Sequence, residues 1–451
     1  MSLASPNPPQ SAEGTAAAVE RATLAKVKRR LLPFLFLLYV VCFLDRVNVG
    51  FAALQMNHDL GLSPAAYGFG AGVFFLGYVL FEVPSNLVLA RIGARVWIAR
   101  IMITWGLLAA AMMFVRGPLS LYALRFLLGV AEAGFFPGII YYLSGWFPAA
   151  ERARAMSWFL MAIPLSGVVG GPLSGALLGL NGHLGLAGWQ WLFLVEGLPA
   201  VVLGFVVLLY LTDRPEEARW LTPAGRAWLS THMSQEREQC ERRHGLSVLE
   251  AFSNRTVWQL GLLFLCNTFG VSVLGLWLPQ IVKGFSGLND SMVGFVSAVP
   301  YLVAAVAMVL VAAHSDRSGE RPVHIAAAAM TAAFGFVASA YLHSPLLIVL
   351  ALSLAAAGLQ SSRGPFWTLP SVFLSGSAAA GGIALINSVA NVSGFVGPYV
   401  IGVLKGASGS FHSGLLLLAL VSLAGAALAL RLRRAPVLTA VPRTVATPAV
   451  P

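Results

Sequence analysis

The sequence predicts an all-α integral membrane protein, with twelve transmembrane helices arranged as two pseudo-symmetric bundles of six. Three observations lead to this fold class. First, 58% of the 451 residues are hydrophobic and only 10% are charged, whereas a soluble domain carries about 25% charged residues. Second, apolar runs of about 20 residues, each long enough to cross a bilayer as a helix, recur along the chain. Third, landmarks in the first half recur in the second half at a constant spacing.

The apolar runs define the expected elements in order, and the polar residues between them set the boundaries. The twelve predicted spans lie near residues 31–53, 66–90, 96–115, 119–145, 154–178, 189–212, 257–281, 291–314, 322–342, 345–370, 380–404 and 412–431. The chain is therefore divided into an N-terminal segment (1–30), a first bundle (31–212), a linker (213–256), a second bundle (257–431) and a tail (432–451). Within the long polar linker we expect a helix along the membrane surface.

A constant spacing relates the two bundles. The loop RIGAR follows the second span and begins at Arg91, and the loop RSGER follows the eighth span and begins at Arg317, 226 residues later. A Gly-Pro pair begins at Gly171 in the fifth span and another at Gly397 in the eleventh, again 226 residues apart. Two separate landmarks with one offset indicate a duplicated six-helix unit. Repeat-built transporters bind substrate near the membrane midplane, between their repeats.

The positive charges alternate between the two predicted sides. Of the 29 Lys and Arg residues, 23 fall in segments that share one side, including both ends of the chain and the linker. The opposite loops hold only Arg116, Lys283 and Lys405. Cytoplasmic loops of membrane proteins carry this excess of basic residues, so we expect both termini in the cytoplasm. The net charge of +11 therefore reflects membrane topology and predicts no nucleic-acid partner.

Motifs for other functions are missing from the sequence. No GxxxxGK[ST] loop occurs, so we do not expect ATP to power the protein directly. Cys42, Cys240 and Cys266 are scattered and have neither disulfide-framework nor metal-ligand spacing. The first 20 residues lack the charged start and short apolar core of a cleaved signal peptide. We expect no cofactor, no metal and no enzymatic activity.

Charged residues inside the predicted spans are the main indication of function. A charge at the bilayer centre costs about 3 kcal/mol or more, so it is tolerated mainly where it is paired or lines a watery cavity. The charged positions within spans are Asp45, Arg46, Glu82, Arg125, Glu132, Glu196 and Arg363. Charges of both signs in an otherwise apolar chain predict a polar passage through the membrane, and therefore transport.

Two pairs of charges are the strongest candidates for the site. Asp45 and Arg46 are neighbours that point about 100° apart on a helix, so each must meet a different partner. Arg46 presents a planar fork that fits a carboxylate, whereas Asp45 can gain a proton if burial favours the neutral form. Arg125 and Glu132 lie two helical turns apart on one face. The alternative is a purely structural role, in which Arg125 pairs permanently with Asp45.

The other three charges differ in their expected roles. Glu82 lies beside a Pro-Ser-Asn sequence and Glu196 shortly before Pro199, where each can satisfy buried polar groups of an interrupted helix. A structural role is therefore favoured for both. Arg363 precedes Gly-Pro in the tenth span and is the only charge within the spans of the second bundle. It is either a second contact for an anion or a structural group.

Several stretches resemble a known family. The RIGAR and RSGER loops resemble the cytoplasmic signature of the major facilitator superfamily, although Ala90 replaces the usual Asp before the first loop. The stretches 43–48, 77–86, 125–133, 364–367 and 381–387 resemble the anion:cation symporter branch, which includes bacterial tartrate, phthalate and hydroxyphenylacetate permeases. The resemblance covers about residues 25–432. It implies the major facilitator fold and identifies Glu132 as the main proton carrier, with Arg125 linking substrate to protons.

Residues and resemblance together predict the uptake of a small organic anion, a carboxylate, by alternating access in a bacterial inner membrane. Protons, or another cation, would drive the uptake, and the protein would act as a monomer. The expected substrate-binding residues are Arg46, Tyr78, Arg125, Arg363, Trp367, Asn387 and Asn391. The expected proton-coupling residues are Asp45 and Glu132. The alternative function is a proton-driven exporter of a metabolite or drug.

Overall fold

The computed structural model describes residues 10–242, 253–370 and 376–433. Within these ranges the regular elements are helices, and twelve spans are long and apolar enough to cross a membrane. The first bundle contains α1 (Gln10–Asp59), α2 (Pro64–Ile92), α3 (Ala94–Ala111), α4 (Pro118–Glu132), α5 (Phe135–Ser144), α6 (Ala149–Leu160), α7 (Ala162–Leu178) and α8 (Gly188–Tyr210). The second contains α11 (Arg255–Ser286), α12 (Asp290–Ser318), α13 (Arg321–Tyr341), α14 (Pro345–Ser361), α15 (Arg363–Trp367), α17 (Gly376–Ser408) and α18 (His412–Leu432).

The all-α fold with twelve spans agrees with the sequence prediction, but some boundaries differ. The first helix begins at Gln10, well before the predicted residue 31. Three predicted spans are each divided into two helices, α4 and α5, α6 and α7, and α14 and α15. Apolar length alone cannot reveal such breaks, because apolar residues lie on both sides of each break within the same predicted span.

The duplicated loops have related backbone geometry. In the first bundle, α2 starts at Pro64, where the Ser63 hydroxyl accepts a hydrogen bond from the backbone of the first turn. It ends at Gly93, which has φ of 103°. In the second bundle, α12 ends at Gly319 with φ of 72°. Both central glycines of the RxGxR loops thus have a positive φ, which favours glycine, as expected for a repeated unit, although only Gly319 lies in the αL region.

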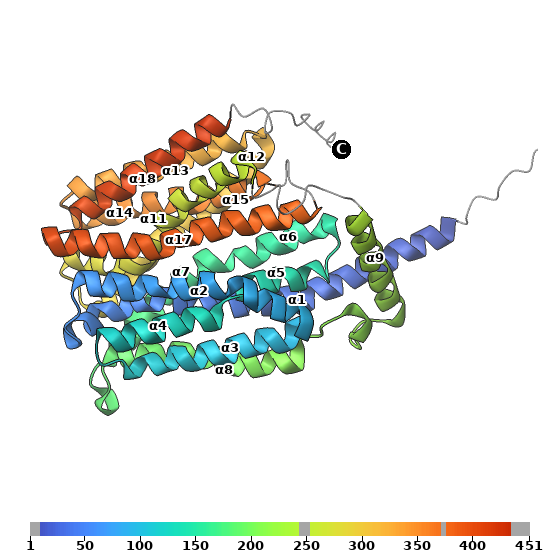
Figure 1. Ribbon diagram of the computed structural model, residues 1–451, viewed down its shortest axis with the longest axis horizontal. Coiled ribbons are helices and arrows are strands. Elements are labelled where there is room, and N and C mark those ends of the chain that lie inside the picture. The colour runs from blue at the N-terminus through green and yellow to red at the C-terminus, as the bar shows by residue number, and fades with distance from the viewer. Residues whose placement is uncertain (1–9, 243–252, 371–375, 434–451) are drawn as a thin grey trace, which may run out of the picture.

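The two bundles lie side by side along their lengths, the first in blue to green and the second in yellow to red (Figure 1). They meet through three helix pairs, α2 with α17, α7 with α12, and α1 with α11. Small residues allow very close approach there: a Cβ atom added to Gly171 would lie 2.5 Å from the carbonyl oxygen of Gly294, and one added to Gly68 would lie 2.4 Å from that of Pro398. Gly68 and Gly294 are themselves related by the 226-residue repeat.

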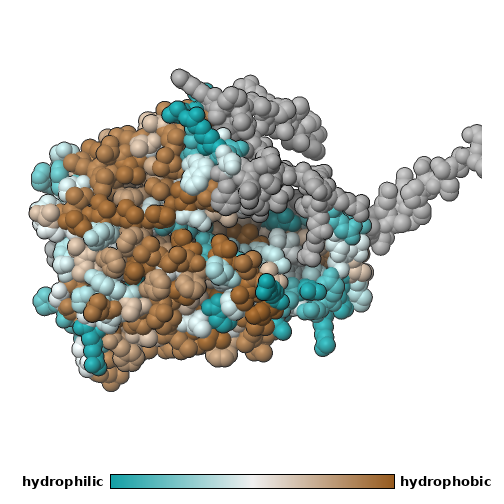
Figure 2. Space-filling model, viewed as in Figure 1, coloured by the Kyte–Doolittle hydropathy of each residue, from teal (hydrophilic) through white to brown (hydrophobic). Residues whose placement is uncertain are grey.

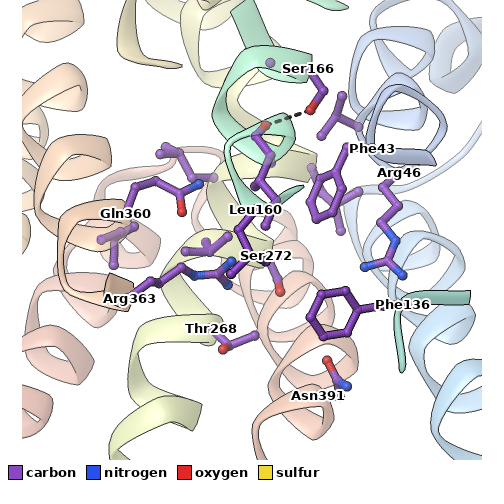
Figure 3. Close-up of a pocket in the computed structure, with 18 of the residues that line it drawn as sticks. Phe43, Arg46, Phe136, Leu160, Ser166, Thr268, Ser272, Gln360, Arg363 and Asn391 are labelled. Carbon is purple, nitrogen blue, oxygen red and sulfur yellow. Dashed lines mark hydrogen bonds between the residues drawn. The ribbon is translucent and has the colours of Figure 1, made fainter. Parts of the chain in front are cut away.

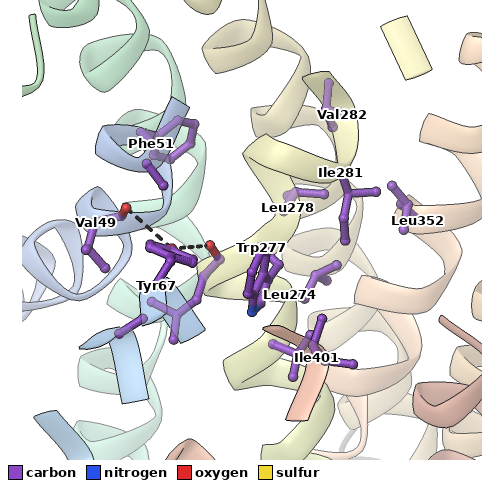
Figure 4. Close-up of a cluster of buried hydrophobic side chains, with 14 of the residues drawn as sticks. Val49, Phe51, Tyr67, Leu274, Trp277, Leu278, Ile281, Val282, Leu352 and Ile401 are labelled. Atoms are coloured by element: carbon purple, nitrogen blue, oxygen red, sulfur yellow. Dashed lines mark hydrogen bonds between the residues drawn. The ribbon is translucent and has the colours of Figure 1, made fainter. Parts of the chain in front are cut away.

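Among the described residues, the hydrophobic core joins the bundles at one end only. We call this the far end; it contains the turn between α1 and α2. There Tyr67 packs edge-on against Trp277 at 4.8 Å and donates a hydrogen bond to the carbonyl of Leu276 at 2.7 Å, with side chains of both bundles around them (Figure 4). At the opposite end, each bundle has a core cluster of its own, one around Trp146 and the other around Phe264.

The opposite end carries the linker helix α9 (Pro223–Arg242), and we call it the α9 end. The linker is anchored to the first bundle, where Trp220 stacks on Trp146 at 5.4 Å and Arg152 pairs with Glu236 at 3.2 Å. The helix predicted in the linker is therefore present. The N-terminal part of α1 lies at the same end of the molecule (Figure 1).

The surface between the two ends is largely hydrophobic. Figure 2 shows this on the face viewed, with hydrophilic residues gathered mainly at the left and right ends. Large apolar side chains such as Leu80, Leu119, Leu209 and Phe334 are exposed there. A helical bundle that spans a bilayer presents apolar side chains outward to the lipid, as these do.

Candidate substrate-binding site

A cavity lies between the two bundles, with walls formed by both. It leaves about 160 Å³ for the centres of water-sized molecules. One water needs about 10–15 Å³ on this measure, so the cavity has room for a compact organic molecule of about ten non-hydrogen atoms. Toward the far end it stops at Gly275 and Leu276 of α11, where α1 packs so closely that a Cβ on Gly50 would lie 2.9 Å from the Leu276 carbonyl oxygen.

Arg46 forms the charged part of the wall in the first bundle. Its Nη2 and Nε atoms lie 2.5 Å and 2.6 Å from the same oxygen, Oε1 of Glu132. The Cys42 thiol donates to this oxygen as well, at 3.2 Å. The Arg46 side chain is 19% exposed to the cavity, whereas Glu132 is only 1% exposed. Glu132 thus contacts Arg46 on the side away from the cavity, and a ligand in the cavity can contact this pair only through the arginine.

The position of Glu132 follows from a break in the helix. Glu132 is the last residue of α4, and Gly134 after it has φ of 88°, in the left-handed region. The hydroxyl of Ser85 on α2 donates to the freed carbonyl of Ala133 at 2.6 Å. A side chain at residue 134 would collide with that hydroxyl, since a Cβ atom would lie 2.3 Å from it. The packing of Ser85 therefore requires a glycine at residue 134, and the carbonyl that the break frees receives a hydrogen bond from Ser85.

Asp45 points away from the cavity, into the first bundle. It is 2% exposed and accepts a hydrogen bond from Asn48 at 2.8 Å and another from the indole nitrogen of Trp105 on α3. Asp45 and Arg46 therefore meet different partners, as their adjacency on one helix required. The structure places Asp45 behind α1, without direct contact with the cavity.

Arg125 is also buried behind the cavity wall. It is 1% exposed, donates to the carbonyl of Ala71 at 3.1 Å and lies 4.9 Å above the ring of Phe74. Among the described residues it forms no ion pair, so the alternative of a fixed pair with Asp45 is not what the structure shows. In this conformation Arg125 does not line the cavity, and its expected contact with the substrate stays a prediction. Its two-turn spacing from Glu132 brings it to the same helix face without joining the two.

The wall in the second bundle carries an arginine without an acidic partner. Arg363 is the first residue of α15 and is half-buried; its Nε donates to Asn267 Oδ1 at 3.4 Å. Asn267 is held in turn by the Leu359 carbonyl and the Ser362 hydroxyl, at 2.7 and 2.8 Å. No acid lies within ion-pair distance of Arg363 among the described residues. In Figure 3 the side chains of Arg46 and Arg363 reach toward the cavity from opposite walls.

Aromatic and neutral polar groups complete the lining. The ring of Tyr78 lies 5.1 Å from the guanidinium carbon of Arg46, and Trp367 packs edge-on against Phe264 at 4.9 Å. Asn391 reaches the cavity from α17, and Arg363 lies above Phe264 at 5.6 Å. An arginine held over aromatic rings keeps its planar fork oriented for a carboxylate.

Asn387 lines the cavity one turn from Asn391 on the same face of α17, as their spacing predicted. Its Nδ2 donates to Oε1 of Glu82 on α2 at 3.2 Å, across the boundary between bundles. Glu196 has a different environment: it is buried in the first bundle, away from the cavity, and accepts a hydrogen bond from Ser174 at 2.8 Å. The structural interpretation thus fits Glu196 better than Glu82.

Six of the predicted residues line this cavity, namely Arg46, Tyr78, Arg363, Trp367, Asn387 and Asn391. Sequence reasoning missed Gln360, Thr268 and Ser272, which also line it, and Asn267, which positions Arg363. The spacing of Gln360 and Arg363, three residues apart in an apolar span, was an available signal. In the described ranges no group of three or more metal-ligating side chains is placed to hold a metal ion.

Comparisons with known proteins agree with this architecture. The sequence profile of the Major Facilitator Superfamily matches residues 35–398. A relative named "Putative tartrate transporter" in Agrobacterium vitis is 53% identical over 88% of this chain and 91% of its own. A quinolone resistance transporter of Acinetobacter baumannii is 43% identical over 90% of this chain and 94% of its own.

A solved structure has the same fold. It is the crystal structure of a bacterial homologue of the human lysosomal transporter Spinster, in an inward-facing and occupied conformation. It superimposes with a TM-score of 0.70 at 18% identity, covering 90% of this chain and 95% of its own. At that identity the likeness concerns the fold alone.

Proposed function

The chain belongs to the major facilitator superfamily, and within that family we propose that it is a proton-coupled importer of a small carboxylate anion. It is a multi-pass membrane protein and a transporter rather than an enzyme. The proposed location is the bacterial inner membrane. The proposal concerns the cargo, the coupling ion and the direction of transport.

The contact between Glu132 and Arg46 carries the proposal. Charged Glu132 occupies two donor nitrogens of the arginine that faces the cavity. Protonation of Glu132 weakens this contact and frees the guanidinium for a substrate carboxylate. Proton binding and anion binding therefore favour each other, and by thermodynamic reciprocity the anion also raises the affinity for the proton. Such positive linkage is what a symporter needs, because the loaded carrier takes both together.

Arg363 supports an anionic cargo independently. It stays charged under all conditions, and among the described residues its side chain donates a hydrogen bond only to a neutral amide, that of Asn267. An anion that contacts Arg46 on one wall and Arg363 on the other would tie the two bundles together. Compact hydroxy acids fit the cavity volume, and the name of the 53% identical relative makes tartrate the first candidate.

The conformation fits an inward-facing carrier if the α9 end is cytoplasmic. The basic loops and α9 lie at that end, where the positive-inside rule places the cytoplasm. The shared core and the close contact of α1 with α11 close the far end. Alternating access would then open the far end by rocking one bundle against the other about the helix pairs α2–α17 and α7–α12.

Export is the second candidate function, because one relative is named as a quinolone resistance transporter. A proton-driven exporter requires proton and cargo to compete for the site, so that each leaves as the other binds. The contact between Arg46 and Glu132 gives the opposite sign for an anion. The sign of this linkage therefore favours import, and it can be measured directly.

Uptake into proteoliposomes tests the proposal. Purified protein is reconstituted, and an inward proton gradient is imposed in the presence of labelled L-tartrate, phthalate or 4-hydroxyphenylacetate. The proposal expects accumulation of at least one acid, which stops when a protonophore dissipates the gradient. If none of the acids accumulates, or if the imposed gradient drives acid out of preloaded vesicles, the importer assignment is wrong.

A further inference from the structure

Glu82 and Asn387 form a polar contact between the bundles that the proposed coupling of Arg46 and Glu132 leaves unused. The amide nitrogen of Asn387 donates to Glu82 Oε1 at 3.2 Å and links α2 to α17. The other side-chain hydrogen bonds between bundles in the described ranges come from Gln55, Asn57 and Tyr67, all near the far end. Glu82 and Asn387 thus form the one such contact on the α9 side of the cavity centre.

The surroundings of Glu82 disfavour an uncompensated charge. Its side chain is 9% exposed and forms no ion pair among the described residues. The charged and titratable groups that act on it are Arg46 from α1 and Tyr78 one turn earlier on α2. From α17 it meets only the neutral amide of Asn387. A buried carboxylate with one neutral donor is costly, and a proton removes that cost.

Asn387 serves two sites. It lines the cavity, and its amide nitrogen is also the donor to Glu82. A substrate carboxylate that binds at Asn387 comes close to the Glu82 carboxyl group. Two like charges at one amide repel each other, so a charged Glu82 and a bound anion disfavour each other.

We propose that Glu82 is a second proton-coupling group, which competes with the substrate carboxylate for the amide of Asn387. The inference rests on the proposed carboxylate transport and adds a residue to its mechanism. An anion in the cavity favours protonated Glu82, so the loaded carrier holds a proton there. When the cavity faces the cytoplasm, loss of that proton restores the negative charge and the hydrogen bond with Asn387. Both changes expel the anion, so Glu82 acts in the release step.

Proton uptake on substrate binding tests this role directly. The probe is the acid that accumulates best in the uptake panel, added to purified protein in weakly buffered detergent solution with a pH-indicator dye. We expect Glu82→Gln to take up about one proton fewer per bound anion than the parent. The neutral glutamine no longer repels the anion, so the anion should bind more tightly and leave more slowly. KM and kcat for uptake should therefore fall together by about tenfold, within the usual range of coupling between sites.

Two further variants make the test decisive. Asn387→Leu removes the shared amide and should also lower the proton uptake, so it carries the test if Glu82→Gln does not fold. Glu196→Gln, a buried acid away from the cavity, should bind protons and anion as the parent does. If proton uptake and KM are unchanged in both Glu82→Gln and Asn387→Leu, the inference about Glu82 is wrong. That result would leave the proposal of carboxylate import intact. A parent that accumulates no acid of the panel would refute both proposals.

Discussion

Replacing Glu132 with glutamine tests the link between proton and anion at its centre. Two nitrogens of Arg46 and the Cys42 thiol converge on Glu132 Oε1 in a site that is almost fully buried. A hydrogen bond to a charged group contributes about 1.5–3 kcal/mol net. Glutamine still accepts a hydrogen bond from Arg46 but no longer attracts its charge, so the lower value applies. At about 1.4 kcal/mol per factor of ten, the anion should bind about tenfold more tightly at neutral pH.

Isothermal titration calorimetry of the detergent-purified protein measures this effect, with the acid identified by the uptake panel. In the parent, binding of the anion should be accompanied by proton uptake, because an ionised Glu132 competes with the anion for Arg46. Glu132→Gln should bind the anion tightly, take up about one proton fewer per bound anion and accumulate the acid to a lower level than the parent, because Glu82 still carries a proton. A Glu132→Gln protein that binds more weakly than the parent, or that takes up as many protons per bound anion as the parent, would refute the assigned role.

Three other changes test separate parts of the structure. Arg363→Ala should weaken binding of the anion by about a hundredfold. Arg363→Lys should weaken it by less, because a lysine keeps the charge but loses the planar fork of donors. If both variants bind the anion as tightly as the parent in calorimetry, Arg363 is not part of the site. Gly129→Ala should lower the apparent melting temperature, since its Cβ would lie 2.0 Å from a carbonyl oxygen of α2 and overpacking costs about 1–3 kcal/mol; an unchanged melting temperature would contradict this packing. Asp290→Asn should loosen the far end by about 1 kcal/mol, because Asp290 pairs with Lys283 at 2.9 Å and accepts from Gln55 at 3.0 Å. Hydrogen–deuterium exchange should then rise at the far ends of α1 and α12, and unchanged exchange would argue against a closing role.

The fold was predictable because a bilayer imposes a strong length requirement on apolar segments. The repeat was equally readable, since the loops beginning at Arg91 and Arg317 keep their offset from the Gly-Pro pairs. The breaks that divide three of the predicted spans into two helices could not be predicted from the sequence. Glu132 and Arg363 both stand at such breaks, where hydrophobicity does not change but backbone direction does. Gly134 was the one local sign of the first break, and its meaning depends on Ser85 of another helix.

Partner choice among the charges could not be derived from spacing along one helix. Arg125 and Glu132 share a face, yet Glu132 binds Arg46 of α1 while Arg125 turns to a backbone carbonyl of α2. Which partner each residue meets depends on how these three helices, α1, α2 and α4, cross, and no pattern within one span contains that information. The contact of Glu82 with Asn387 was hidden for the same reason, because the two residues belong to different repeats.

For the proposed proton-coupled importer of an anion, the distribution of charge between the bundles has a mechanical consequence. In the first bundle Arg46 is controlled by an acid, so its availability to the anion depends on a proton. In the second bundle Arg363 has no acid within ion-pair distance among the described residues, so it can attract the anion whether or not protons are bound. An anion can therefore enter on Arg363 alone, but it draws the bundles together only when a proton has freed Arg46. Because closure requires both contacts, a carrier with anion but no proton remains open and releases its cargo on the side from which it came. In the proposed mechanism, the same requirement would prevent the anion from leaking across the membrane without the proton.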